Sequence, residues 1–445
     1  MKIKVLSRDP NQYIRETKSE THKLKRNFDP KLHQFEAARE YVRALNATKL
    51  DKVFAKPFIG NLDGHRDSIS CISKHPTSLS LLLSGAYNGE LRVWDIPQKK
   101  CIREIQAHDG VLRGISYTND GQHFFSIGDD KNIKMWSSQA PLRPEDEEPA
   151  NTILSKSIIS GISHHFTEDK FATCGEVCQL WEESRNSSIK TYEWGVDTLH
   201  DVAFNPVQSN LLGACAADRS IILYDIRETK PLRKLVMALK SNKICWNPME
   251  AFNFTVASED FNLYTFDTRN LKCPVTMHVD HVSAVMSLDY APTGKEFVTG
   301  SYDKTIRIFE VDKVHSREVY HTKRMQRLTS VQWTLDNKYI LSASDEMNIR
   351  IWKARASEKL GPLKQREKAA LNYSEALKDK YAAHPKIKKI AQRRHVPKHV
   401  YNAQMEMKTI RKAHRRKDAN RKLHSKPGST KTKPEILKKI VREDA

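Results

Sequence analysis

A repeated unit of about 43 residues is the feature that most constrains the fold of this chain. Each copy ends in an aromatic residue, and consecutive terminal aromatics lie 42 to 45 positions apart. These aromatics are Trp94, Trp136, Trp181, Tyr224, Phe266, Phe309 and Trp352. A period of this length is typical of a four-stranded propeller blade. Seven copies therefore predict an all-β, seven-bladed β-propeller.

The residues inside each copy have the pattern of short strands joined by tight turns. In the stretches ELRVW and KTIRIF, apolar and polar residues alternate, which is the period of a strand with one buried face. Asp or Asn lies six positions before the aromatic in five copies, where a short side chain stabilises a turn. These turn residues are Asn88, Asp130, Asp218, Asp260 and Asp303.

The copies resemble the WD-repeat family, since Gly64-His65 opens the first copy and Trp94-Asp95 closes its third strand. In that family, a buried His, Ser or Thr, Asp and Trp form a hydrogen-bonded tetrad within a blade. The resemblance implies a structural tetrad of His108, Ser126, Asp130 and Trp136 in the second copy. It implies a related set in the first copy, made of His65, Ser84, Asn88 and Trp94. The sixth copy offers His278, Thr299 and Asp303, but it ends in Phe309, which has no indole N–H to donate.

Each copy ends before the outermost strand of its own blade, so the last blade must take one strand from elsewhere. We predict that residues 52–60 donate this strand and close the ring, because closure removes an exposed sheet edge. The predicted organisation is an N-terminal arm over 1–51, a propeller over 52–353 and a basic helical extension over 354–445. Residues 137–152 are predicted to form an acidic loop between blades two and three.

The positive charge is concentrated at the end of the chain. Of the net +21, residues 353–445 carry +19, whereas residues 64–352 carry −4. A near-neutral body with one basic arm indicates a scaffold with a polyanion-binding appendage. Two helices are predicted in this arm, over 364–383 and over about 399–424. The first has Ala370, Tyr373, Leu377 and Tyr381 on one stripe, which we expect to lie against a partner or the propeller.

The candidate RNA-binding residues lie after Pro385 and along the second predicted helix. Contacts from cations to phosphates supply affinity while carrying little sequence information. The predicted residues are Lys386, Lys388, Lys389, Arg393, Arg394, Lys408, Arg411, Lys412, Arg415, Arg416, Lys417, Arg421 and Lys422. The alternative is a solvated charged helix that serves only as a nuclear-localisation signal.

The two arms resemble those of the suppressor-of-fibrillarin family of nucleolar WD-repeat proteins. The resemblance spans the whole chain and is carried by MKIKVLSRDPNQYIRETK, ALNATKLDKVFAKPF, SDEMNIRIWKARASEKLG, RRHVPK and HSKPGS. It implies location in the nucleus and nucleolus, and a scaffold role in the small-subunit processome that supports pre-rRNA processing. The implied partners are pre-ribosomal RNA, a box C/D small nucleolar ribonucleoprotein and other processome proteins.

A second functional class is indicated by two short boxes in adjacent copies, Tyr224-Asp225-Ile226-Arg227 and Phe266-Asp267-Thr268-Arg269. They resemble the box through which some propellers dock on the adaptor of a cullin-RING ubiquitin ligase. The resemblance implies docking by Asp225, Arg227, Asp267 and Arg269, and an alternative or additional role as a substrate receptor. The simpler interpretation is a surface ion pair at each strand turn, which contributes little to stability.

Several classes of function are not indicated by the sequence. The seven cysteines are odd in number and widely spaced, which does not predict a disulfide framework. Cys174 and Cys178 have no second cysteine pair or histidine pair at zinc-finger spacing, so no metal site is predicted. There is no run of about 18 apolar residues for a membrane span. A Gly-rich phosphate loop, a paired metal-binding histidine motif and a nucleophile elbow are also missing from the sequence, so we expect no catalytic residues and no cofactor.

Overall fold

The structure is a computed structural model, and it describes residues 35–139, 148–193, 197–426, 429 and 434–444. The chain divides into two compact units. One unit comprises the described parts of Met1–Lys56 together with Ala356–Arg393, and the other comprises those of Pro57–Arg355 together with Arg394–Ala445. Half of the predicted acidic loop, residues 140–147, and the whole segment MKIKVLSRDPNQYIRETK lie outside the described residues.

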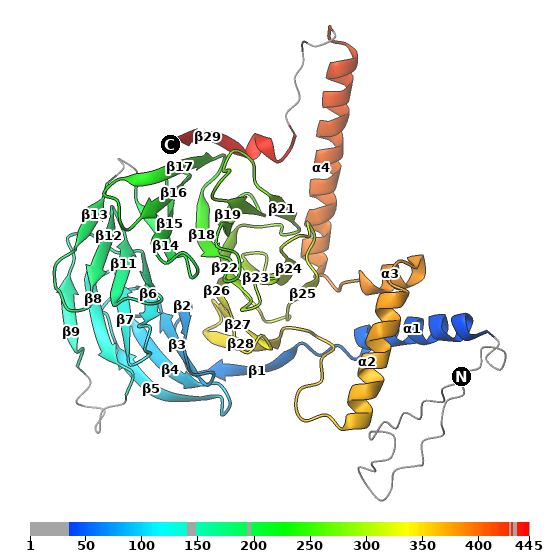
Figure 1. Cartoon of the computed structure of the whole chain (residues 1–445), viewed down its shortest axis with the longest axis horizontal. Helices are drawn as coiled ribbons and strands as arrows, with labels where there is room; N and C mark the ends of the chain where they lie inside the picture. Colours follow the sequence, from blue (N-terminus) through cyan, green and yellow to red (C-terminus); the bar gives the residue numbers. More distant parts are fainter. Residues whose placement is uncertain (1–34, 140–147, 194–196, 427–428, 430–433, 445) are drawn as a thin grey trace, which may run out of the picture. The chain divides into compact units, whose positions relative to one another are not determined.

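The larger unit confirms the predicted seven-bladed propeller, with seven antiparallel sheets arranged in a ring (Figure 1). Blades one and two contain β2 (Ile69–Lys74), β3 (Leu81–Ala86), β4 (Glu90–Asp95), β5 (Lys100–Gln106), β6 (Leu112–Tyr117), β7 (His123–Gly128), β8 (Asn132–Ser137) and β9 (Asn151–Leu154). Blades three and four contain β10 (Gly161–His164), β11 (Lys170–Cys174), β12 (Cys178–Glu182), β13 (Lys190–Tyr192), β14 (Leu199–Phe204), β15 (Leu211–Ala216), β16 (Ser220–Asp225) and β17 (Pro231–Met237). Blades five and six contain β18 (Ser241–Trp246), β19 (Asn253–Ser258), β20 (Asn262–Asp267), β21 (Thr276–Val279), β22 (Val285–Tyr290), β23 (Glu296–Ser301), β24 (Ile306–Glu310) and β25 (Glu318–Tyr320). Blade seven contains β26 (Leu328–Trp333), β27 (Tyr339–Ser344) and β28 (Asn348–Lys353).

Blade seven receives its fourth strand from β1 (Phe58–Asp63), which pairs antiparallel with β28. This strand is displaced from the predicted segment 52–60, of which only residues 58–60 belong to β1. The helix-forming stretch before it continues in α1 (Glu36–Val53), and Pro57 then favours extended backbone in the residue before it. The closing strand therefore begins only after α1 has ended, and this helix was not predicted from the sequence.

The core of the propeller lies between neighbouring blades. Leu83 and Leu91 of blade one, for example, pack with Leu112 and Phe124 of blade two in one fully buried cluster. The second strand of most blades is buried along nearly its whole length, as in β7 and β15. Each blade thus packs its apolar faces against the neighbouring blades, which joins the seven sheets into one ring.

The four tetrad residues of blade two are joined by hydrogen bonds. His108 Nδ1 donates to the Asp130 carboxylate over 2.8 Å, and Ser126 Oγ lies 2.8 Å from His108 Nε2. Trp136 Nε1 donates to Ser126 Oγ over 2.9 Å. Burial lowers the pKa of His108 in spite of the opposing effect of Asp130, so the imidazole is held in its neutral form.

The sixth copy corrects the histidine assignment. His281, not His278, bonds to Asp303 and Thr299, over 2.9 and 2.8 Å. His278 instead belongs to the polar centre of blade five, where its Nε2 lies 3.0 Å from Thr265 Oγ1. The reason is geometric, because His281 precedes β22 by four residues, the same spacing that separates His108 from β6.

The first copy also departs from the expected set. His65 Nε2 lies 2.5 Å from Ser84 Oγ, and Trp94 Nε1 donates to the same oxygen over 2.7 Å. Asn88, however, bonds to the backbone and side chain of Glu90 and not to the histidine. Glu90 brings a carboxylate oxygen to 3.9 Å from His65 Nδ1, so a glutamate stands beside the ring where the family has aspartate.

The C-terminal part of the larger unit contains α4 (Lys398–Leu423), the short 3-10 helix η4 (Leu437–Lys439) and a last strand, β29 (Ile440–Asp444). The helix matches the predicted span of about 399–424 to within one residue at each end. The strand was not predicted, and it adds to the outer edge of blade four beside β17 (Figure 1).

The smaller unit is formed by α1 with α2 (Gln365–Lys380) and α3 (Pro385–Ala391). Ala44, Leu377 and Ile387 form its buried core. The expectation that the apolar stripe of the first predicted helix covers a partner or the propeller is corrected, because that helix packs against the chain's own α1. Lys378 Nζ lies 2.5 Å from the carboxylate of Asp51.

In the described part of the chain, no helix has the length and apolar character needed to cross a membrane.

Candidate nucleic-acid and protein interfaces

The basic helix α4 carries eight of the predicted RNA-binding cations, but they do not all share one face. Spacings of three, four and seven residues place side chains on the same side of a helix. By this criterion, one face carries Lys408, Arg411, Lys412, Arg415 and Lys422, which we call the basic stripe. All of these side chains are exposed except Arg411, which is half-buried. The stripe extends over about 21 Å at 1.5 Å per residue.

The remaining cations of α4 are also exposed: Lys417 and Arg421 lie on the side of the helix opposite the basic stripe, and Arg416 lies at the edge of the stripe, four residues after Lys412. Arg415 lies near a carboxylate, because its Nη2 is 3.6 Å from Glu435 Oε2. Its side chain is nevertheless 78% exposed. An exposed pair of this kind is weak, so it leaves the charge of Arg415 available to a polyanion.

The predicted cations around α3 form a separate group in the smaller unit. Lys388, Lys389 and Arg393 line a shallow surface depression with Pro385 and Gln392. Lys386, on the same short helix, is exposed as well. This arrangement gathers three positive charges at one place on the surface.

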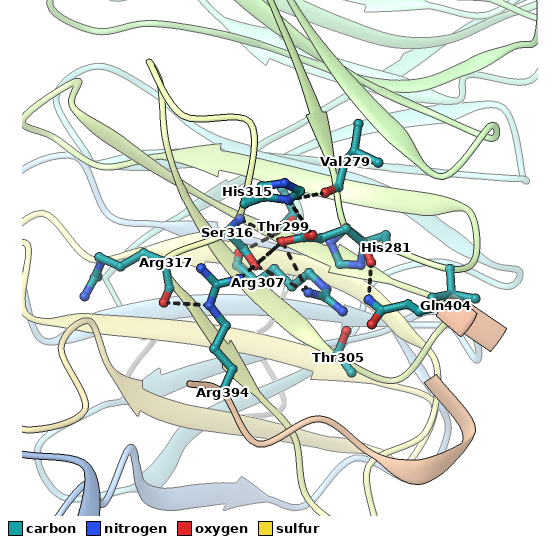
Figure 2. Close-up of polar contacts among 12 residues, drawn as sticks. Val279, His281, Thr299, Thr305, Arg307, His315, Ser316, Arg317, Arg394 and Gln404 are labelled. Atoms are coloured by element: carbon teal, nitrogen blue, oxygen red, sulfur yellow. Dashed lines mark hydrogen bonds and ion pairs between the residues drawn. The ribbon is translucent and has the colours of Figure 1, made fainter. Parts of the chain in front are cut away.

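Arg394 does not belong with these exposed cations. Its Nη1 lies 3.6 Å from Asp280 Oδ2, and its Nε donates to the carbonyl oxygen of Arg317 over 3.2 Å (Figure 2). Only 24% of its side chain is exposed. The interpretation of Arg394 as an RNA contact is therefore corrected, because its guanidinium binds Asp280 and the Arg317 carbonyl oxygen of blade six.

Asp280 is the acceptor at the centre of this contact, and the sequence analysis did not single it out. Its carboxylate accepts from Ser316 Oγ over 2.7 Å and from His315 Nδ1 over 2.9 Å (Figure 2). The buried guanidinium of Arg307 lies 3.6 Å away. Burial raises the pKa of Asp280, but Arg307 and the hydrogen bonds outweigh this effect and hold the pKa below its usual range. The available signal was that Asp280 immediately precedes the tetrad histidine.

The first turns of α4 dock at the same place. Gln404 Nε2 donates to the carbonyl oxygen of Asp280 over 2.8 Å, and His399 Nε2 donates to that of Asp303 over 3.3 Å. Val400 is almost completely buried. Blade six thus anchors the first turns of the basic helix, and these contacts fix the position at which α4 leaves the propeller.

The two Asp-x-Arg boxes have the same geometry in adjacent blades. Arg227 Nη2 lies 2.7 Å from Asp225 Oδ2, and Arg269 Nη2 lies 2.7 Å from Asp267 Oδ2. In each box, the backbone N–H of the arginine donates to the same carboxylate over 2.9 Å. The hydrogen bond from the arginine lowers the pKa of Asp225 and likewise that of Asp267.

These boxes present two arginines to solvent, because the side chains of Arg227 and Arg269 are 71% and 67% exposed. Arg233 links the two blades by donating to the carbonyl oxygens of Thr268 and Arg269. The Arg269 guanidinium lies 4.5 Å from the ring centroid of Phe252. Both boxes therefore place an exposed arginine, paired with its aspartate, on the surface of neighbouring blades.

The cysteines have the environment of buried apolar residues. Cys174 and Cys178 face each other across β11 and β12 inside an apolar cluster. Burial raises the pKa of the Cys178 thiol to about 12. Among the residues that the structure describes, no three His, Cys, Asp or Glu side chains are grouped so as to hold a metal ion.

Comparison with known proteins decides the family. Residues 354–440 match the Sof1-like domain, and residues 56–95, 99–137, 272–310 and 317–353 match the WD domain, G-beta repeat. Proteins called DDB1- and CUL4-associated factor 13 from Danio rerio and Homo sapiens are each 55% identical to this chain, over 442 and 441 residues and 99% of both chains. The protein of that name from Dictyostelium discoideum is 46% identical over 421 residues, covering 94% of this chain and 95% of its own.

The chain belongs to the DDB1- and CUL4-associated factor 13 family. The resemblance to the suppressor-of-fibrillarin proteins is confirmed by the Sof1-like match, which covers most of the C-terminal extension. The WD matches leave out residues 138–271, which contain most of blades three, four and five. WD repeats and the Sof1-like domain are scaffold modules, and this family member is a scaffold protein and not an enzyme.

Proposed function

We propose that this family member is a nucleolar scaffold of the small-subunit processome, in which the propeller binds proteins and the basic extension binds pre-ribosomal RNA. The observation that carries the proposal is the basic stripe on a helix anchored to a near-neutral propeller. The Sof1-like match over residues 354–440 supports a role in ribosome biogenesis, and therefore a nuclear and nucleolar location. A box C/D small nucleolar ribonucleoprotein and other processome proteins are the proposed neighbours.

The charge on α4 suits a phosphate backbone better than a specific base sequence. Lysine and arginine bind phosphates through charge-assisted hydrogen bonds and release the counterions that surround RNA. If about five cations engage at once, RNA affinity falls by about a hundred-fold or more between about 50 and 200 mM salt. A helix fixed at one end loses less conformational entropy on binding than a free tail does.

The test compares two triple variants that remove equal charge from α4. The stripe variant replaces Lys408, Lys412 and Arg415 with Gln, and the control variant replaces Arg416, Lys417 and Arg421 with Gln. Both variants carry an unrelated nuclear import signal, so that a loss of localisation does not confuse the result. We expect the stripe variant to lose most crosslinks to pre-ribosomal RNA and to lower small-subunit rRNA, while the control retains both. Equal crosslinking by the stripe variant and the wild-type chain would contradict RNA binding by the stripe.

A second function is favoured by the two Asp-x-Arg boxes. The relatives are named as DDB1- and CUL4-associated factors, and in this chain Arg227 and Arg269 stand exposed with the same geometry on adjacent blades. We propose that Asp225, Arg227, Asp267 and Arg269 dock on the DDB1 adaptor, so that the propeller also acts as a substrate receptor of a cullin-RING ubiquitin ligase. In each box, the carboxylate orients its arginine and thereby reduces the entropy lost on docking.

Replacing Arg227 and Arg269 together with Ala tests this second function. We expect at least a ten-fold loss of adaptor binding, with the melting temperature and the association with ribosomal precursors unchanged. The matched control replaces Arg66 and Arg185, two exposed arginines that also form surface ion pairs, with Ala. Undiminished adaptor binding by the first variant would reduce the boxes to surface ion pairs.

A further inference from the structure

Asp260 of blade five occupies the position of a tetrad aspartate without its histidine. It stands six residues before Phe266, as Asp130 stands before Trp136 in blade two. In blade two, the pairing histidine precedes the first strand of the blade by four residues. In blade five, the residue at that spacing before β18 is Met237. The side chain of Asp260 is nevertheless buried, with 6% of its surface exposed, and a buried carboxylate requires a compensating charge.

The compensating charge comes from the C-terminal end of the chain. Lys439 Nζ lies 3.1 Å from Asp260 Oδ2. The phenol of Tyr264 donates to the same oxygen, and the backbone N–H of Asn262 donates to Oδ1 over 3.1 Å. Burial and the neighbouring Asp260 raise the pKa of Tyr264, so this phenol remains a donor. The carboxylate is thus satisfied by two groups of its own blade and one cation from the last residues of the chain.

The residues that follow Lys439 are held by main-chain pairing. The N–H of Ala238 donates to the Lys439 carbonyl oxygen over 2.8 Å. Beyond it, β29 pairs antiparallel with β17, and Ile440 stands opposite Met237. Ile440 also packs against the apolar cluster shared by blades four and five. The outer strand of a sheet presents unpaired backbone groups, which an added strand satisfies.

We propose that Asp260 and the outer edge of β17 form a binding site for an extended peptide that carries a lysine directly before its strand, and that residues 439–444 of this chain are its ligand. The lysine replaces the missing tetrad histidine of blade five, and the strand supplies the main-chain pairing. This site does not depend on the proposed RNA or ligase functions.

The consequence concerns the basic helix. The start of α4 is fixed on blade six by Arg394 and Gln404, and the segment beyond its end is fixed on blades four and five by Lys439 and β29. Figure 1 shows α4 leaving the propeller near β25 and β29 returning to it beside β17. Contacts with the propeller therefore hold both the start of α4 and the residues from Lys439 to Asp444.

The first experiment uses the full chain and measures amide hydrogen exchange in residues 440–444. We expect Lys439→Ala to raise the exchange rate of these amides at least ten-fold. Lys439→Arg is expected to stay close to the wild-type chain, because it keeps the cation. The matched control is Lys438→Ala, which removes the neighbouring exposed lysine. Exchange in Lys439→Ala that equals exchange in Lys438→Ala would overturn the role of Lys439.

Asp260→Asn tests whether the two groups act as a pair. We expect it to raise the exchange rate in residues 440–444 in the same way, and we expect Lys439→Ala to add little in the Asp260→Asn background. Fully multiplicative effects of the two changes would show that they act independently and would overturn the pairing.

The second experiment supplies the ligand separately. A chain ending at residue 433 is mixed with a fluorescent peptide of residues 434–444, and binding is measured by anisotropy. We expect saturable binding that weakens at least ten-fold when the peptide carries Lys439→Ala or the chain carries Asp260→Asn. Binding that is equal for both peptides would overturn the requirement for the lysine. If the shortened chain does not fold, as judged by circular dichroism, the exchange measurements on the full chain decide the proposal.

Discussion

Arg394 and Arg307 approach one carboxylate, that of Asp280, each at 3.6 Å. Arg307 is a buried residue of blade six, whereas Arg394 belongs to the segment that leads into α4. The same aspartate therefore compensates a charge inside the propeller and fixes the start of the basic helix. A substitution of Asp280 is therefore expected to affect both the stability of the propeller and the attachment of α4 to it.

Asp280→Asn is expected to destabilise the propeller by about 2 to 4 kcal/mol, because it leaves the buried Arg307 without one of its two nearby carboxylates. Urea unfolding measures this loss, and Asp312→Asn, at an exposed position, is the control. The variant is also expected to increase amide exchange in the first turns of α4. Stability equal to that of the control would show that Asp303 alone compensates Arg307.

Asp130→Ala is expected to cost about 1 to 3 kcal/mol, since it leaves the buried Nδ1 of His108 without its acceptor. The measurement is again the free energy of unfolding, with Asp120→Ala at an exposed turn as the control. A free energy equal to that of the control would rule out a stabilising role for the blade-two tetrad.

Stability is expected to fall in mild acid because of His278. Burial lowers the pKa of His278 from 6.5 to about 4, so the folded state keeps the ring neutral while the unfolded chain binds a proton. The contribution is fully present above the unfolded pKa of about 6.5 and is lost as the pH falls from there toward about 4. Between about pH 7.5 and pH 5, this one group removes about 2 kcal/mol.

The check is the free energy of unfolding of His278→Asn at the same two pH values. Asparagine can donate to the Lys313 carbonyl oxygen as His278 Nδ1 does, and it does not titrate. We expect a smaller loss in acid than for the wild-type chain, with His414→Asn at an exposed site as the control. An unchanged pH dependence would locate the acid sensitivity in other groups.

Ring closure by β1 is tested by Leu62→Ala and by deletion. Leu62 is fully buried in the cluster that joins blades one and seven, so its truncation is expected to cost about 2 to 5 kcal/mol. Deleting residues 1–63 is expected to lower the melting temperature, whereas deleting residues 1–34 leaves the closing strand in place. Equal melting temperatures for the two deletions would contradict closure by this strand.

The propeller could be predicted from the sequence because the residue patterns that indicate it are local and repeated. A terminal aromatic every 43 residues or so, and a turn residue such as Asp130 six positions before it, follow from strand length and hairpin geometry within a single blade. The concentration of charge after residue 353 is likewise a property of the linear chain. These features indicated the propeller, the basic helix near 399–424 and the two Asp-x-Arg boxes without knowledge of any distant contact.

Only the tertiary structure decided which residues meet. The tetrad histidine of blade six is an exception, because His281 lies 22 residues before Asp303, the same spacing that separates His108 from Asp130. Arg394 is an arginine like the exposed Arg393 before it, and the local sequence does not distinguish the two. Its guanidinium nevertheless faces Asp280. Lys439 reaches Asp260 only because β29 returns to the edge of blade four. Contacts between segments far apart in the chain depend on how the blades pack, and no local period or spacing encodes that packing.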